Sequence, residues 1–269
     1  NRLYNPNVYE RLRVSYSLFT LFKTFDAFGY NGNNNPIESY NYFEPRVSGK
    51  KFRVPKRYYN EVWMSSDYRR IFALDARIGV WNWSEYGVTG TKMRISPRVR
   101  FSDHLFITLG YRQRWVKNDI GWVNTMNEVD SIVFGGRDIE ETELSVSARY
   151  VFTKDISLEM NLRHFWTEVK YNQFFLLQDD GSVDDFPEYN TNHDINFNSL
   201  NLDLKFSWWF APASQIVLLY RNNFLDSDQS VDISYGDNLL NSLRANQDHT
   251  ISLRITYFLD VNYLRRNNK

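Results

Sequence analysis

Apolar and polar side chains alternate at a period of two residues through nearly every ordered-looking segment of this 269-residue chain. In residues 71–81, for example, Phe72 and Leu74 share one parity, whereas Asp75 and Arg77 share the other. Successive side chains of a β-strand point to opposite faces, so this pattern predicts strands with one apolar and one polar face. No segment sustains the i, i+3, i+4, i+7 spacing of an amphipathic helix. The sequence therefore predicts an all-β fold.

This alternation predicts about ten strands. Pro97 lies on the apolar parity of one of them, which indicates a β-bulge at that position. The expected strands cover residues 11–22, 59–65, 71–81, 92–101, 105–114, 143–152, 156–163, 200–208, 216–224 and 251–259.

The connections between these segments alternate between short and long. Short turns on one rim and long polar loops on the other are typical of outer-membrane barrels, where the tight turns face the periplasm. We therefore expect a transmembrane antiparallel outer-membrane β-barrel of about ten strands, with both termini in the periplasm. The expected periplasmic turns are residues 66–70, 102–104, 153–155 and 211–214, and the expected outer loops are residues 26–56, 87–91, 119–140, 178–196 and 226–247.

A soluble β-sandwich or barrel is the alternative, because its strands alternate in the same way. Two features favour the membrane barrel: arginine is frequent on the polar parity, and aromatic residues gather at both ends of the apolar segments, as at the two interfaces of a bilayer. The expected belt beside the short turns contains Phe101, Phe152, Phe206, Trp208, Trp209, Phe210 and Tyr257, and the expected belt beside the long loops contains Trp115, Trp122, Trp166 and Phe224.

Composition narrows the class of protein further. The mean hydropathy of -0.54 and the lack of an apolar run near 20 residues exclude a transmembrane helix but not strands that cross a membrane. The 32 Lys and Arg residues balance 32 Asp and Glu residues, so no global charge favours a nucleic-acid partner. The chain has no cysteine, which excludes disulfides and thiolate metal sites. We expect a single β-barrel domain over residues 1–269, or the C-terminal part of a longer barrel protein.

Charged side chains on the polar parity form the candidate functional site. In a narrow barrel they would face the lumen and interlock as paired charges that fill the interior. A selective path for anions is the alternative, and the small number of strands favours the filled lumen. The predicted lumen network comprises Asp75, Arg77, Arg94, Arg98, Arg112, Arg149, Glu159, Arg163, Asp203 and Arg254, with Arg114 and Glu143 on the same parity.

The four histidines give little support for hydrolytic chemistry. A hydrolase holds a histidine or a carboxylate pair within hydrogen-bond reach of a nucleophile or a water molecule. His104 falls in a short turn, His164 on the lipid-facing parity, and His193 and His249 in or beside outer loops. Although Asp194 directly follows His193, adjacency in sequence does not orient a side chain. We expect no catalytic residue and no cofactor.

An acidic loop offers a candidate calcium site. Asp179, Asp180, Asp184 and Asp185 surround the turn-forming Gly181 and supply the hard oxygen ligands that calcium prefers. The loop lacks the spacing of the 12-residue calcium loop and its terminal glutamate. We interpret this segment as a solvated polar loop, with calcium binding as the alternative.

Several runs resemble a known family as whole segments. They are SSDYRR (65–70), SPRVRFSD (96–103), IVFGGRDIEETELSVSARYVF (132–152), NFNSLNLDLKFSWWFAPASQIVLLYRN (196–222) and SLRITYFLDVNYLRR (252–266). They resemble the C-terminal barrel region of Bacteroidota outer-membrane proteins of unknown function, which carry an N-terminal domain similar to family-9 carbohydrate-binding modules. The resemblance implies a barrel in the outer membrane of a Gram-negative bacterium. The carbohydrate-binding-like domain is absent from this sequence, so carbohydrate binding is carried over to no residue.

The expected role is structural or binding at the cell surface, without catalysis, as a component or client of a larger outer-membrane complex. A small-solute channel or transporter is the first alternative, and a barrel hydrolase is the second. The expected partners are outer-membrane lipid and other outer-membrane proteins. The last strand, residues 250–264, has an edge that needs a partner in lipid, which makes it the expected contact for the barrel-assembly machinery.

Overall fold

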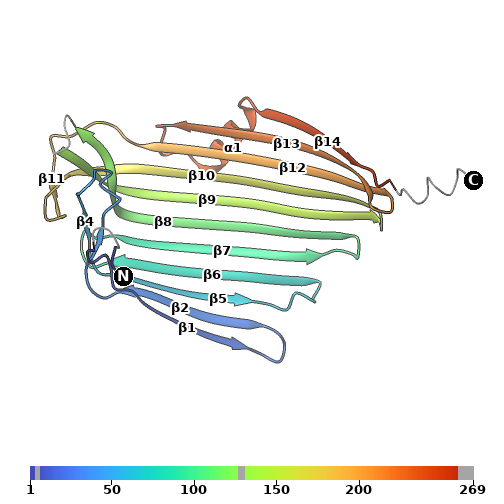
Figure 1. Cartoon of the computed structure of the whole chain (residues 1–269), viewed down its shortest axis with the longest axis horizontal. Coiled ribbons are helices and arrows are strands. Elements are labelled where there is room, and N and C mark those ends of the chain that lie inside the picture. The colour runs from blue at the N-terminus through green and yellow to red at the C-terminus, as the bar shows by residue number, and fades with distance from the viewer. Residues whose placement is uncertain (4–6, 127–130, 260–269) are drawn as a thin grey trace, which may run out of the picture.

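The computed structural model describes residues 1–3, 7–126 and 131–259. A single curved antiparallel sheet dominates it (Figure 1), with neighbours in the order β1-β2-β5-β6-β7-β8-β9-β10-β12-β13-β14 and the short β11 added to β10. The strands along this order are β1 (Val14–Leu21), β2 (Ala27–Asn35), β5 (Arg57–Ser65), β6 (Phe72–Trp83), β7 (Thr89–Arg100), β8 (Leu105–Met126), β9 (Ser131–Thr153), β10 (Ile156–Leu177), β12 (Ile195–Ala211), β13 (Ser214–Asp228) and β14 (Asp248–Thr256).

Each strand of this order pairs antiparallel with the one before it, which confirms the all-β antiparallel prediction. Tight turns join the strands at one end of the sheet, here called the short-turn end, and the long connections lie at the other, the long-loop end (Figure 1). The expected periplasmic turns, such as residues 153–155 between β9 and β10, lie at the short-turn end.

The strand count corrects the expected topology. Residues 26–56 were expected to form one outer loop, but they contain β2 (Ala27–Asn35), which pairs with β1 and with β5. With eleven strands in the path instead of ten, the N-terminus lies at the long-loop end, whereas β14 runs towards the short-turn end (Figure 1). The expectation that the N-terminus lies on the short-turn side is therefore wrong.

The two faces of the sheet differ in chemistry as the alternation predicts. On one face, apolar side chains stand next to each other across strands: Leu18 of β1 is opposite Tyr30, which is opposite Val62 of β5. At the other edge, Leu218 of β13 is opposite Leu253 of β14. We call this the apolar face, and we call the opposite face, which carries the charged residues, the polar face.

The two outer strands each have a single neighbour. In the part of the chain that the structure describes, β1 pairs with β2 and β14 pairs with β13, and nothing pairs with their other edges. All eight residues of β1 and all nine of β14 are exposed. The sheet described here is therefore open, and the edge of the last strand, which was expected to need a partner, is not paired with β1. Tyr263 and Leu264, at the end of the expected last strand, lie outside the described residues.

A compact apolar core lies at the long-loop end. Residues 119–140 were expected to be a loop, but β8 extends to Met126 and β9 begins at Ser131, and the hairpin of β3 (Ser39–Asn41) and β4 (Phe52–Val54) packs against these strands. Asn118 adopts a positive φ of 54° where the register of β8 on β9 shifts, and the strand continues beyond this bulge. We call this cluster the long-loop core; it comprises Phe52, Val54, Val88, Ile120, Ile132, Phe134, Phe175, Leu177 and Val183.

The connection between β13 and β14 contains one helix, α1 (Tyr235–Arg244). Ser234 caps it by accepting a hydrogen bond from the backbone N–H of Asp237 at 3.2 Å, as the N-cap position requires. Its buried Asn238 bonds with Asn198 of β12, so the helix rests on the sheet. None of the described helical residues forms a span long and apolar enough to cross a membrane.

Two further expectations are corrected by the packing. The register of β7 with its neighbours does not shift at Pro97, so no bulge forms there. Of the aromatic belt expected beside the long loops, only Trp115 is exposed: Trp166 and Phe224 are buried, and Trp122 packs against the long-loop core. The belt beside the short turns is largely exposed, at Phe101, Phe152, Trp208, Trp209 and Tyr257.

Candidate lumen-facing charge network

The polar face carries rows of charged side chains, because residues of one parity on adjacent strands meet in register. Arg77 of β6 is opposite Arg94 of β7, which is opposite Arg112 of β8, which is opposite Glu143 of β9. Two residues along each strand, the same face carries smaller polar residues instead, with Asp75 opposite Ser96 and Gly110 opposite Ser145. The positions predicted for the lumen network thus share one face.

Ion pairs link the strands from β9 to β13. Each joins side chains that are directly opposite or diagonal in the register, as cross-strand pairs do. Most of these side chains are partly solvent-exposed, so solvent screening weakens each pair. The pairs are Arg163 with Glu143 (2.7 Å), Arg149 with Glu159 (3.7 Å), Lys205 with Glu159 (3.0 Å) and Arg221 with Asp203 (2.7 Å).

A second group of ion pairs lies nearer the long-loop end of β5 to β9. Lys92 contacts Glu61 at 3.0 Å, above Gly79, whose missing side chain leaves room for the lysine stem. Glu141 contacts Arg114 at 2.6 Å and Arg112 at 3.7 Å. Glu61 and Glu141 thus pair with three cationic side chains, those of Lys92, Arg112 and Arg114.

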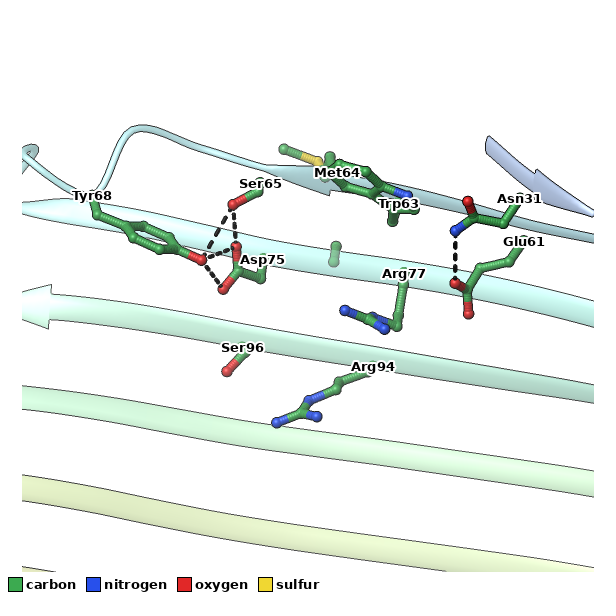
Figure 2. A pocket seen from close by; sticks show the side chains of 11 residues that line it. Asn31, Glu61, Trp63, Met64, Ser65, Tyr68, Asp75, Arg77, Arg94 and Ser96 are labelled. Atoms are coloured by element: carbon green, nitrogen blue, oxygen red, sulfur yellow. Dashed lines mark hydrogen bonds between the residues drawn. The ribbon is translucent and has the colours of Figure 1, made fainter. Parts of the chain in front are cut away.

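Asp75 was predicted to belong to the network, but it bonds to hydroxyl groups instead of arginine. Its carboxylate accepts hydrogen bonds from Ser65 at 2.6 Å and from Tyr68 at 2.7 Å (Figure 2). These residues line a cavity of about 490 Å³ on the polar face, together with Arg77 and Arg94. The cavity is open on one side and polar.

Four of the predicted network arginines make no ion pair within the described part of the chain. Arg98 lies over the ring of Tyr68, with its guanidinium carbon 4.3 Å from the ring centre, which is a cation–π contact. Arg77 and Arg94 point into the cavity without a bonded partner (Figure 2), and Arg254 stands on the edge strand β14. Asp75 and these four are therefore not part of one continuous ion-pair network.

The acidic loop does not converge on a metal position. Asp179 pairs with Lys50 at 2.8 Å, and this ammonium group lowers the pKa of its carboxyl below the ordinary value. Asp180 bonds to the N–H and hydroxyl groups of Ser182, which also lowers its pKa. Asp184 and Asp185 lie on β11 (Val183–Asp185). Among the described residues, no group of three or more His, Cys, Asp or Glu side chains is placed to hold a metal ion.

The histidines lie apart from one another and bond to tyrosines or the backbone. His193 bonds to the hydroxyl of Tyr189 at 2.7 Å, His249 to that of Tyr220, and His164 to that of Tyr235 on α1. His104 bonds to the backbone oxygen of Val151 on β9, at 2.7 Å. Asp194, which follows His193, accepts a hydrogen bond from the backbone N–H of Tyr171 instead of orienting the imidazole.

Sequence reasoning missed several partners in the network. Arg221 lies on β13, where apolar and polar residues alternate weakly, and Glu61 and Lys92 lie two strands apart with a glycine between them. Alternation assigns each of them a face but not a partner. The cross-strand register, which pairs Asp203 with Arg221, is the signal that finds them.

Comparisons with known proteins add a family and a fold. The model of a family described as "Domain of unknown function (DUF5916)" matches residues 1–268. No curated protein matches the chain. Among solved structures, one titled "Copper transporter OprC", an outer-membrane barrel, superposes with a TM-score of 0.52 at 10% sequence identity. The match covers 91% of this chain and 42% of the transporter chain, so this chain spans less than half the length of that structure. The likeness shows the fold alone.

Proposed function

Because this chain belongs to the DUF5916 family, whose description assigns no activity, we propose a function from its geometry: the sheet is part of the wall of an outer-membrane β-barrel that acts by binding, not by catalysis. The observation that carries this proposal is the apolar face, which extends from β1 to β14 and exposes large side chains such as Leu18, Ile78, Leu218 and Leu253. Near the long-loop end, where α1 rests on it, Trp166, Leu200 and Phe224 of this face are buried. A continuous exposed apolar surface of this extent needs a partner, and lipid is the partner that covers the outside of a barrel.

Strand length supports a membrane location. A transmembrane strand needs about 9–11 residues when it is tilted. Strands β2, β5 and β14 have 9 residues each, and β6 and β7 have 12. The exposed aromatic belt at the short-turn end, which includes Phe152 and Trp208, fits one bilayer interface. We place the short-turn end in the periplasm and the long-loop end outside the cell.

The unpaired edges of β1 and β14 need further backbone partners if the sheet lies in a membrane. An unpaired strand edge is not tolerated in lipid, because each backbone N–H and C=O group must be bonded. We propose that further antiparallel strands pair with β1 and β14 to complete the barrel, consistent with a fold match that covers only part of the transporter barrel. During assembly, the β14 edge is the contact for the barrel-assembly machinery. Deleting residues 257–269 then abolishes insertion but leaves export to the periplasm intact; normal insertion after that deletion contradicts this role.

A small-solute channel or transporter is the second candidate, and the open sheet favours it. The expected filled lumen depended on a narrow barrel of about ten strands, and a wall extended beyond β1 and β14 encloses a wider interior. Planar-bilayer conductance of the purified protein separates the two: steady single-channel steps support a channel, and a silent bilayer supports binding alone. The placement of the histidines gives a hydrolase no support.

The membrane location is tested by cell fractionation. The protein is expected in the outer-membrane fraction, resistant to alkaline extraction, with the heat-dependent gel mobility of a folded barrel. Recovery in the soluble periplasmic fraction would contradict the proposal. The assignment to Bacteroidota, which comes from the resemblance of whole segments, stays a prediction.

A further inference from the structure

Three arginines stand side by side in one row of the polar face. Arg77 is directly opposite Arg94, and Arg94 is directly opposite Arg112. Adjacent strands lie about 4.8 Å apart, so the side chains leave the sheet at that spacing. Like charges directly opposite each other in a sheet are destabilising. The row therefore concentrates positive charge at a cost to the fold.

The carboxylates near this row already have other partners. Asp75 bonds to Ser65 and Tyr68, and Glu143 pairs with Arg163 at 2.7 Å. Glu61 and Glu141 pair most closely with Lys92 and Arg114 at 3.0 and 2.6 Å. Arg112 reaches only the long 3.7 Å contact with Glu141.

Arg77 and Arg94 make no ion pair or hydrogen bond within residues 1–3, 7–126 and 131–259. Both are exposed to solvent and project into the cavity of about 490 Å³ (Figure 2). Guanidinium groups bind carboxylate and phosphate oxygens through two parallel hydrogen bonds, which a lone ammonium group does not offer. The cavity thus contains two guanidinium groups that have no bonded partner among the described residues and that can bind an anionic ligand.

An aromatic surface adjoins the row. Trp63 of β5 is directly opposite Arg77, and its indole lies over Gly29 of β2, where a Cβ atom would come within 2.1 Å of the ring. Phe19 of β1 stacks on the same indole, at 6.0 Å between ring centres. Trp63 is therefore held against the sheet and lines the same cavity as the arginines.

We propose that Arg77 and Arg94, which line the cavity with Arg112 beside them in the row, form an oxyanion-binding site on the polar face, which takes a small solute bearing a phosphate or carboxylate group. The anion's charge offsets the repulsion within the row, and Trp63 packs against the apolar part of the solute. The inference rests on the proposed barrel only in that the polar face must line a solvent-filled lumen to be reached by solute.

Calorimetric titration with inorganic phosphate and with succinate tests the site on the detergent-purified full-length protein. The double variant Arg77→Gln and Arg94→Gln should weaken binding at least tenfold. The matched control is Arg254→Gln, which removes an exposed arginine of the same face, with no described ion pair, from β14. It should leave binding unchanged. Equal binding by the double variant, or no binding by the unmodified protein at 10 mM ligand, would overturn the proposal.

Thermal unfolding tests whether these arginines have a purely structural role. In buffer without phosphate, the double variant should unfold at the same temperature as the unmodified protein or higher, because like charges have been removed. Phosphate should raise the unfolding temperature of the unmodified protein and not that of the double variant. A lower unfolding temperature of the double variant in phosphate-free buffer would show that the arginines are structural, through pairing with another part of the barrel, and would overturn the proposal.

These outcomes are separate from those of the fractionation experiment. Loss of phosphate binding concerns the arginine row alone, because the double variant should still fractionate with the outer membrane. A protein found in the soluble periplasm refutes the barrel whatever its affinity for phosphate.

Discussion

The long-loop core and the apolar face of the sheet are built from the same kinds of large apolar residue, but the core buries them and the face exposes most of them. In the core, Phe134 and Phe52 are 0% and 2% exposed, and their rings lie 4.9 Å apart. On the apolar face, Ile251 and Leu253 are 73% and 63% exposed. The chain thus buries large apolar side chains where its own loops can cover them and leaves them uncovered along the sheet.

The total surface makes the same distinction. A folded water-soluble monomer of 32.2 kDa exposes about 12,300 Å². The accessible surface of this chain is 17150 Å². An open sheet accounts for a larger surface, because α1 and the β3–β4 hairpin cover only parts of it, and among the described residues the outer edges of β1 and β14 are unpaired. The contrast teaches that the long-loop core is covered by the chain's own loops, whereas the exposed part of the apolar face depends on a partner that the described residues do not provide.

The largest effect is expected in the long-loop core. Phe134→Ala leaves a cavity against Phe52 and should cost about 3–5 kcal/mol of local stability. The matched control, Phe72→Ala, truncates a 55% exposed ring on the apolar face and should cost much less. Protease cleavage within residues 36–56 of the membrane-inserted protein measures the difference. Equal protection in both variants would show that the two regions are not distinct.

A charge on the apolar face should have the next largest effect. Leu204 is opposite Met160 on one side and Tyr220 on the other, so Leu204→Arg places a guanidinium group against lipid and should cost about 2–4 kcal/mol near the bilayer midplane. The control Asn161→Arg adds the same charge to the polar face, beside Asp203. Urea unfolding in lipid vesicles measures both. A larger cost for the control would mean that the faces are reversed.

A smaller effect concerns the pH dependence of the loop between β10 and β12. His193 stacks on Tyr189 and packs near Tyr171 and Phe174, and burial lowers its pKa below 6.5, against the opposing charge of Asp194. An imidazole with a lowered folded pKa stabilises packing above pH 6.5, and this contribution is lost as the pH falls through the folded value.

Proteolysis of that loop should therefore increase as the pH falls from 7 to 5. His193→Gln should abolish this dependence, because the titrating group is gone. An acid-independent cleavage rate in the unmodified protein would contradict the assignment.

The sequence predicts the faces of the strands well and the connections poorly. The alternation of Leu200 to Trp208 fixes which side chains share a face, because that periodicity is local. It fails for β2, AFGYNGNNN, whose glycines and asparagines do not read as a strand. Gly29 is suited to its place only because Trp63 of the neighbouring strand lies over it, which is a tertiary contact.

The candidate site shows the same limit. The predicted arginines lie on the predicted face, but the sequence cannot say that Arg221 holds Asp203 or that Arg77 stands opposite Arg94. Those pairings depend on register, which hairpin turns and bulges far along the chain determine. The long-loop core was missed for a related reason. Ile132 and Phe134 lie in a segment that was expected to be a polar loop, and they become buried only because β3 and β4 pack on them.

The central claim is that the sheet crosses the outer membrane with its long-loop end outside, and labelling of intact cells tests it most directly. The described chain has no cysteine, so single cysteines at Asp179, at Val8 near the N-terminus and at Asp103 in a short turn report separately to a membrane-impermeant maleimide. The account predicts labelling at positions 179 and 8 on intact cells, and labelling at 103 only after the outer membrane is permeabilised. Labelling at 103 but not at 179 would reverse the orientation, and labelling of all three on intact cells would contradict a sheet that crosses the membrane.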